Sequence, residues 1–276
     1  MTRPPTNLTL YEAAVQHPFA EVRMAERVWQ YHRQSSPGDT GAIPLLLRED
    51  FAGTAAVAAA WCDSHPERQA LAVECDHKTI RAAQRRRPPD DYRDLHLVES
   101  DIMALRGPRV DTVAVLSFSI GYLHTRADLL AYLRHTRRNL RPHGTLLLDL
   151  FGGPGSETPG TQSRPVTPND PTLPPFTYHW EQRRFDPLTR RIDCRIHFDL
   201  SNGATRKNAF RYDWRLWTPT ELTDALIEAG FQQPTCWCDR YDPETNQSDG
   251  HYRPASNTHR THARHDWVIY LSACRD

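Results

Sequence analysis

Short aliphatic runs alternate with segments of helical spacing through the first half of the chain, and this pattern predicts an α/β fold. Each run has the length of a strand and is followed by a turn and a segment long enough for a helix. Strands that alternate with helices form a parallel sheet with helices on both faces. The predicted strands are Leu45–Glu49, Ala70–Val73, Leu95–Ile102, Val110–Leu116 and Thr145–Asp149, and the predicted helices are Ala55–Asp63, Lys78–Arg87 and Arg126–Asn139.

The regions on either side of this core have different patterns. Residues 151–175 are rich in Pro, Gly, Ser and Thr, which predicts either a lid or a disordered loop. Three strand-like runs follow, at 176–185, 191–200 and 207–217, and the turn signals between them predict an antiparallel meander. The predicted organisation is an N-terminal helical cap (1–40), a ligand-binding core (41–150), a loop with a β insertion (151–217) and a C-terminal completion of the core (218–276).

The predicted parallel strands end in acidic or polar residues. Glu49 ends the first strand, and Glu74 ends the second about 20 residues after Gly53, the separation at which such folds place an acid on ribose hydroxyls. The third predicted strand closes on Asp101, which can accept from an adenine amino group while Ile102 packs on the ring. Any one of these acids could instead cap a helix, so the prediction rests on their ordered recurrence at the edge where open α/β sheets bind ligands.

The turn after the first strand defines the kind of ligand. Gly53 and Thr54 lead into an alanine-rich helix whose free N–H groups face the ligand. Phe51, Ala52 and Ala55 stand where a dinucleotide fingerprint has further glycines, so a pyrophosphate is not expected. A glutamate at the strand end repels phosphate and attracts a cation. These features favour a nucleoside-like, positively charged ligand, and S-adenosylmethionine fits that description.

The same residues resemble the class I S-adenosylmethionine-dependent methyltransferases over roughly Leu8 to Asp149. The sequences LREDFAGTA, YEAAVQ and YDWRLWT also resemble an uncharacterised bacterial subgroup, which implies no particular methyl acceptor. The resemblance implies a Rossmann-like methyltransferase sheet, and it implies that an N-terminal helix carrying Tyr11 caps the cofactor, although Tyr11 could equally pack on the surface. The expected cofactor-binding residues are Glu49, Phe51, Ala52, Gly53, Thr54, Glu74, Cys75, Asp101, Ile102, Leu116, Ser117, Phe118, Tyr122 and Tyr11.

In this family, additions after the fifth strand commonly form a cover over the substrate, and the predicted meander lies at that place. Its aromatic residues can either surround a substrate or form a small hydrophobic core. Charged residues beside them, such as Glu181 and Asp213, can orient a polar substrate or form cross-strand salt bridges. The expected substrate-binding residues are Tyr178, Trp180, Tyr212, Trp214 and Arg215.

Composition narrows the class of partner. The 34 basic and 34 acidic residues cancel, which argues against a nucleic-acid or membrane-surface protein. No apolar run has the length of a membrane span, and the N-terminus lacks a signal-peptide core, so we expect a cytoplasmic protein. Six cysteines show no C-x-x-C spacing, and no metal is predicted. Cys236 and Cys238 would place their sulfurs on one face of a strand.

Together these features predict an enzyme that transfers a methyl group by direct displacement to a small-molecule, peptide or natural-product acceptor, with S-adenosylhomocysteine as product. No catalytic acid or base is assigned. Two alternatives stay open: an oxidoreductase with a nucleotide cofactor, and a catalytically inactive cofactor-binding scaffold subunit. An exposed strand edge in the meander is compatible with a homodimer.

Overall fold

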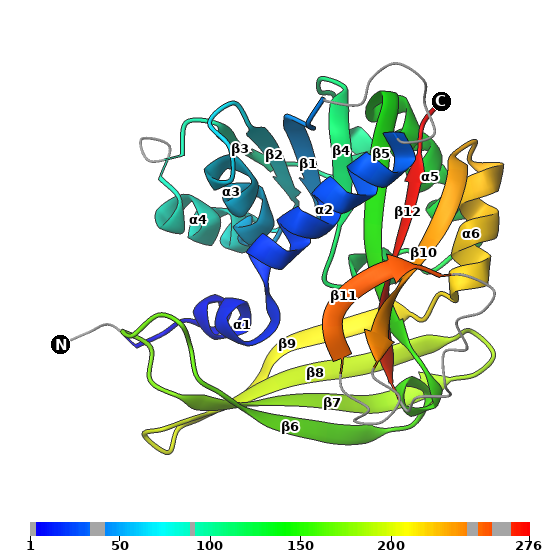
Figure 1. The fold of residues 1–276 in the computed structure, drawn as a ribbon. Coiled ribbons are helices and arrows are strands. Elements are labelled where there is room, and N and C mark those ends of the chain that lie inside the picture. Colours follow the sequence, from blue (N-terminus) through cyan, green and yellow to red (C-terminus); the bar gives the residue numbers. More distant parts are fainter. Residues whose placement is uncertain (1–3, 34–41, 89–91, 242–247, 256–265) are drawn as a thin grey trace. The chain divides into compact units, whose positions relative to one another are not determined.

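The structure is a computed structural model of residues 1–276. It describes residues 4–33, 42–88, 92–241, 248–255 and 266–276 (Figure 1). The chain divides into two compact units. The smaller unit comprises residues 1–17, 152–216 and 263–267, and the larger unit comprises residues 18–151, 217–262 and 268–276.

The larger unit is built on an eight-stranded sheet of order β11-β10-β12-β5-β4-β1-β2-β3. The first five strands of the chain run parallel, while β10 is antiparallel to both β11 and β12. This arrangement confirms the predicted α/β fold class. The strands are β1 (Leu46–Asp50), β2 (Gln69–Glu74), β3 (Leu95–Glu99), β4 (Val110–Val115), β5 (Leu140–Gly152), β10 (Gln232–Tyr241), β11 (Ser248–Pro254) and β12 (Trp267–Cys274).

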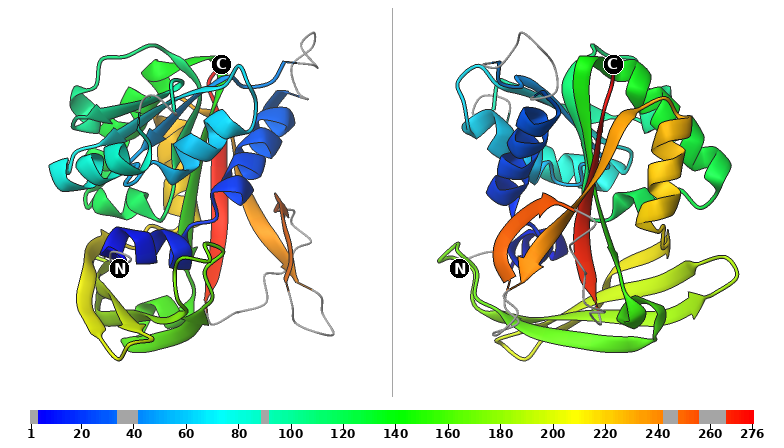
Figure 2. Two further views of the ribbon diagram at one scale, coloured as in Figure 1. Left: turned by 90° about the vertical axis from the view of Figure 1, so that its left-hand side faces the viewer. Right: turned by 45° about the vertical axis from the view of Figure 1, so that its right-hand side comes forward.

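Helices cover both faces of this sheet (Figures 1 and 2). The alanine-rich α3 is buried from Ala56 to Trp61 because its small side chains let it lie close to the sheet and to α2. No helix in the described parts of the chain is long and apolar enough to cross a membrane. The helices are α2 (Pro18–Arg33), α3 (Ala56–Asp63), α4 (His77–Arg86), α5 (Arg126–Asn139) and α6 (Pro219–Glu228), with short 3₁₀ turns η1 (Ile102–Ala104) and η2 (Ser119–Tyr122).

The smaller unit is a four-stranded antiparallel sheet of order β6-β7-β8-β9. It also contains α1 (Asn7–Val15) and η3 (Pro154–Glu157). Three of its strands were predicted from the sequence, but the first lies inside the segment predicted to be a lid or loop. The strands are β6 (Gly160–Val166), β7 (Phe176–Asp186), β8 (Arg191–Leu200) and β9 (Thr205–Arg215).

Candidate functional site

The turn after β1 has an unusual backbone. Phe51, Gly53 and Ala55 have φ angles of 56°, 56° and 59°, in the left-handed region that glycine tolerates and other residues rarely adopt. The amide of Ala52 bonds to the carbonyl of Val73 at 2.9 Å, which fixes the turn to the neighbouring strand β2. Strained backbone of this kind is concentrated at functional sites. The turn therefore keeps a conformation typical of glycine with only one glycine present.

Two of the predicted acids hold this turn and the helix that follows it. Glu49 is buried, and its carboxylate accepts from the amide of Ala58 at 2.8 Å in the first turn of α3. Glu74 accepts from the amide of Gly53 at 3.0 Å and from the amide of Asp76 at 2.8 Å. The structure thus gives Glu49 the helix-capping role considered as its alternative, and it ties Glu74 directly to the turn.

Asp50 was not selected from the sequence, although it is the last residue of β1. Its carboxylate is buried and accepts two hydrogen bonds from Arg48, at 2.7 and 2.8 Å, and one from the hydroxyl of Tyr132 at 2.7 Å. Burial is the main reason that the pKa of Tyr132 lies well above its ordinary value. This group anchors the end of β1 inside the protein.

The third strand end is less enclosed. Asp101 is exposed, and its carboxylate accepts from the amide of Met103 at 2.7 Å, so it caps η1. Ile102 beside it is buried, and Cys75 at the end of β2 is exposed.

An acidic residue that was not selected from the sequence holds the turn after β4. Ser117 and Phe118 have φ angles of 56° and 61°, and their amides donate to the carboxylate of Asp149 at 3.0 and 2.8 Å. Burial raises the pKa of Asp149 well above its ordinary value, and the negative charge of Glu21 adds to this shift. Asp149 ends the predicted fifth strand, so the same search for acidic strand ends would have found it.

Aromatic rings gather beside these turns. Phe51 stacks on the exposed Tyr122 with ring centroids 6.1 Å apart, and Phe118 lies 4.7 Å from Phe151. Leu116, two residues before Phe118, is buried.

The register of the parallel strands brings these segments to one edge of the sheet. Asp50 is opposite both Val73 and Val115, and Val73 is opposite Val98. The turns that follow β1, β2, β3 and β4 consequently lie at the same carboxyl edge, which we call the rim. The rim brings together the predicted residues Glu49, 51–54, 74–75, 101–102 and 116–118, with Tyr122.

The other predicted residues belong to the smaller unit. Tyr11 lies on α1 and packs against Phe210 of β9 with centroids 5.0 Å apart. Trp180 stacks on Tyr212 and on Trp214, each at 6.0 Å, and the latter two rings are 4.2 Å from each other. Tyr212 and Trp214 are buried, so they serve as core of the sheet.

Tyr178 is close to these aromatic rings in the sheet, but its neighbours differ from theirs. It is half-buried, and the guanidinium of Arg164 lies 5.0 Å from its ring centroid. Burial is the main reason that the pKa of Tyr178 is raised.

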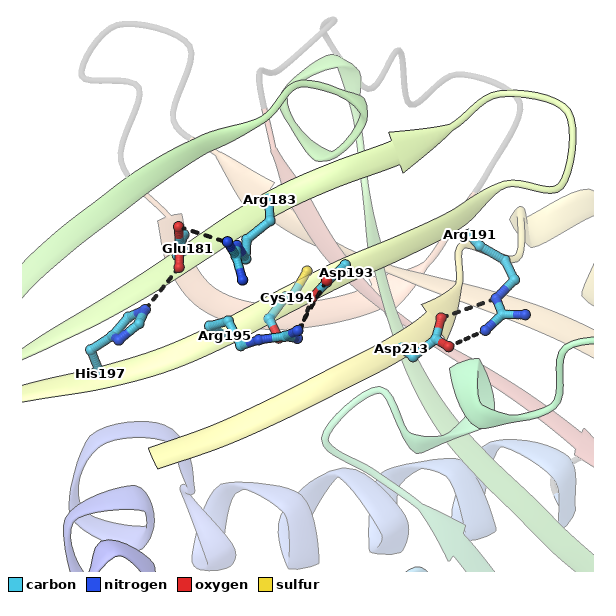
Figure 3. Close-up of polar contacts among 8 residues, drawn as sticks. All are labelled: Glu181, Arg183, Arg191, Asp193, Cys194, Arg195, His197 and Asp213. Carbon is cyan, nitrogen blue, oxygen red and sulfur yellow. Dashed lines mark hydrogen bonds and ion pairs between the residues drawn. The ribbon is translucent and has the colours of Figure 1, made fainter. Parts of the chain in front are cut away.

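Charged residues occupy the face of the four-stranded sheet that is opposite these aromatic residues (Figure 3). His197 lies 3.0 Å from the carboxylate of Glu181, and Arg191 donates to Asp213 at 3.0 Å. These pairs are the cross-strand salt bridges considered as the alternative to substrate contacts. The half-buried Arg215 is two residues after Asp213 and so shares its face.

No protein-family model matches the chain, and no curated protein matches it. Solved structures of similar fold include S-adenosylmethionine-dependent methyltransferases. The CcbJ methyltransferase of Streptomyces caelestis has a TM-score of 0.63 at 15% identity, over 98% of this chain and 97% of that one. The amino pentose methyltransferase CalS10 of Micromonospora echinaspora has a TM-score of 0.63 at 17% identity, over 100% and 99%. The sugar N-methyltransferase KedS8 of Streptoalloteichus has a TM-score of 0.63 at 18% identity, over 100% and 94%.

The similarity extends over nearly the whole length of these chains and includes both units. The chain therefore has the fold of a class I S-adenosylmethionine-dependent methyltransferase, as the sequence resemblance implied.

Proposed function

We propose that this protein is an enzyme that transfers a methyl group from S-adenosylmethionine to a small-molecule acceptor and releases S-adenosylhomocysteine. The observation that carries the proposal is the left-handed turn of residues 51–55, which Glu74 ties to the rim. A Cβ built on Gly53 would meet no atom within 4 Å, so the turn borders open space where a ligand can approach the backbone.

The residues of the rim suit this cofactor. Each oxygen of Glu74 accepts one backbone amide and has a further lone pair for a ribose hydroxyl. Asp101 is exposed beside the rim and can accept from the adenine amino group. The three non-glycine side chains at 51, 52 and 55 occupy positions that a pyrophosphate would need clear, which favours a ligand without phosphate.

When bound, S-adenosylmethionine supplies an electrophilic methyl group on a sulfonium. The chain aligns the acceptor and removes water from the site. These two effects account for a large part of the rate acceleration in an enzyme-catalysed transfer. Phe51, Tyr122 and Phe118 supply apolar surface at the rim for this purpose. We assign no side chain as a general base, since an uncharged amine acceptor requires none at the displacement step.

The acceptor side of the proposal rests on the smaller unit. Trp180 and Tyr178 are half-buried and can contact a substrate on the aromatic face of the sheet, where Tyr212 and Trp214 support them from the core. Arg215 is also half-buried and is proposed as a polar contact on the opposite face. The similar structures include an amino pentose and a sugar N-methyltransferase, which favours a small polar acceptor. The balanced charge of the chain favours an enzyme without nucleic-acid or membrane partners. Tyr11 is proposed as a cap over the cofactor.

Calorimetric titration with S-adenosylmethionine, S-adenosylhomocysteine and NADH tests the proposal. We expect the first two to bind and NADH not to bind. Glu74→Gln should weaken both by roughly tenfold, since it removes charge and leaves an amide group against a backbone N–H. Glu67→Gln, which changes an exposed glutamate before β2, is the matched control and should leave both affinities unchanged.

Binding of NADH in place of S-adenosylmethionine would overturn the proposal in favour of an oxidoreductase. If S-adenosylmethionine binds but no radiolabelled methyl group reaches any acceptor of an amine, hydroxyl and thiol panel, the scaffold alternative is favoured instead.

A further inference from the structure

A pair of cysteines on β10 lies outside the site described above. Cys236 and Cys238 flank Trp237, whose side chain is buried and donates from its indole nitrogen to the hydroxyl of Ser272 at 2.8 Å. Trp237 also packs edge-on against Tyr31 of α2. Since side chains alternate along a strand, both cysteines are on the face of the sheet opposite α2. Their sulfur atoms are 3.9 Å apart, and both side chains are partly accessible.

The backbone fixes this separation. β10 is an interior strand, with Cys236 opposite Leu271 and Cys238 opposite Ile269 on β12. On its other side Cys238 is opposite Arg253 of β11, and the carbonyl of Cys236 accepts from the amide of Ala255 at 2.7 Å. Two ladders therefore hold the thiols in place before any ligand arrives, and this preorganisation lowers the cost of binding.

A direct disulfide does not suit the pair. Residues two apart on a strand have Cα atoms about 6.6 Å apart, near the upper limit for disulfides, and their Cβ atoms cannot reach the separation of about 3.8 Å that a disulfide needs without bending the strand. A bridging atom between the two sulfurs requires no such closure. Within the described residues no three His, Cys, Asp or Glu side chains are grouped to hold a metal ion.

The two thiols are within hydrogen-bond distance of each other, which changes the pKa of both. The hydrogen bond from Cys236 lowers the pKa of Cys238 to about 7, and the same bond raises the pKa of Cys236. The other four cysteines have raised pKa values, and burial is the largest cause in each; that of Cys62 reaches about 12. The thiolate is the reactive form, so this pair combines a nucleophile with an adjacent second thiol at neutral pH.

We propose that Cys236 and Cys238 form a dithiol site for soft, thiophilic ligands whose central atom can bridge two sulfur atoms. Trivalent arsenicals are the representative ligands of this class. With phenylarsine oxide the step is balanced without any oxidant or reductant. Two S–H bonds and the arsenic–oxygen bond break, two As–S bonds form, and the oxygen leaves with both protons as one water molecule.

The site is distinct from the rim, because its residues lie on β10, which β12 and β5 separate from β4 in the sheet. The inference therefore does not depend on methyl transfer. It requires only the strand geometry and the thiol chemistry of the pair.

Intact-mass spectrometry and thiol titration of the full-length protein with phenylarsine oxide at neutral pH test the proposal. We expect one arsenical per chain and the loss of two titratable thiols. The adduct should be reversed by 2,3-dimercaptopropanol and should resist a large excess of 2-mercaptoethanol, because only a dithiol competes with a chelate. Peptide mapping should place it within β10.

Cys236→Ser and Cys238→Ser should each abolish the stable adduct. Cys274→Ser is the matched control, since Cys274 is also a partly accessible strand cysteine, and it should leave the adduct unchanged. Cys236→Ser should also slow alkylation of Cys238 by iodoacetamide at pH 7, because the pKa of Cys238 rises when the hydrogen bond from the Cys236 thiol is lost.

An adduct retained in both single variants, or one reversed by 2-mercaptoethanol, would overturn the proposal. Because the unmodified protein provides the stoichiometry and the reversal, the test remains decisive even if a variant folds poorly.

Discussion

At the scale of single residues, the sequence indicated where the rim acids lie but not what they do. Glu74 was predicted from its place at the end of a strand, and the structure ties it to the turn through the amide of Gly53. Left-handed backbone at Ala55 and Ser117 could not be predicted, because propensity assigns that conformation to glycine. Asp149 stabilises it at Ser117 through a hydrogen bond. The sequence shows Asp149 as an acidic strand end, but it does not show that its carboxylate contacts the turn 32 residues earlier.

Ser117 offers a direct measure of this backbone strain. A φ of 56° costs a residue with a Cβ roughly 1–2 kcal/mol. A glycine has no such steric cost and only loses more chain entropy on folding. We predict that Ser117→Gly is more stable than Ser117→Ala by about 1 kcal/mol, the reverse of the order in a helix. Urea unfolding of the two variants checks this, and Ser117→Ala, which keeps the strain, is the control. A less stable glycine variant would show that the turn is not strained.

Glu21 makes stability depend on pH. Its carboxylate accepts from the hydroxyl of Tyr270 at 2.8 Å, but burial has the larger effect and raises its pKa from 4.5 to about 7. A raised carboxyl pKa means that the folded state holds its proton more tightly than the unfolded state. The resulting stability is complete below about pH 4.5 and is lost as the pH rises through about 7.

Glu21→Gln should remove this dependence. Relative to that variant, the protein should lose roughly 3 kcal/mol of unfolding free energy between pH 5 and pH 8. Urea unfolding at several pH values measures the difference, and the exposed Glu67→Gln serves as control. Parallel pH profiles for the protein and Glu21→Gln would contradict the assignment.

At the scale of elements, hydrophobic periodicity predicted the parallel strands and their helices, but it did not predict β6. Six of its seven residues are exposed, and only Val166 is buried, so the strand lacks the alternation that reveals a half-buried strand. Gly160 and Pro165 add turn signals within it. It is a strand because its backbone pairs with β7 along its length, which residue patterns do not record.

The end of β5 depends on close contact with β12. A Cβ added to Gly152 would lie 2.4 Å from the indole ring of Trp267, where no real side chain fits. We predict that Gly152→Ala lowers the free energy of unfolding by about 1–3 kcal/mol through overpacking. Thermal unfolding measures the loss. Gly107→Ala, where the added carbon meets nothing within 4 Å, is the control and should change stability little. Equal effects of the two substitutions would show that the indole moves aside.

At the scale of the whole molecule, the two units differ in how far sequence could describe them. The larger unit was predictable because a parallel sheet places all its strand ends at one edge, so acids scattered through the sequence could be assigned to a single rim. The aromatic residues of the smaller unit were ambiguous because core and binding surface use the same side chains. Burial resolves Tyr212 and Trp214 as core, which no pattern in the sequence could have done.

Ligand binding should therefore leave a distinct pattern of protection over the molecule. Hydrogen exchange measures local opening, and a ligand that binds only the folded rim slows exchange in the backbone it touches. With saturating S-adenosylhomocysteine we predict protection of residues 51–55, 74–76, 101–104 and 116–119, the turns that border the rim. Protection of α1 as well would support Tyr11 as the cap. The same protein with Glu74→Gln, at equal ligand concentration, should show weaker protection of all four turns because occupancy falls. Protection confined to β11 or to β6–β9 would place the ligand elsewhere and would contradict the proposed cofactor site.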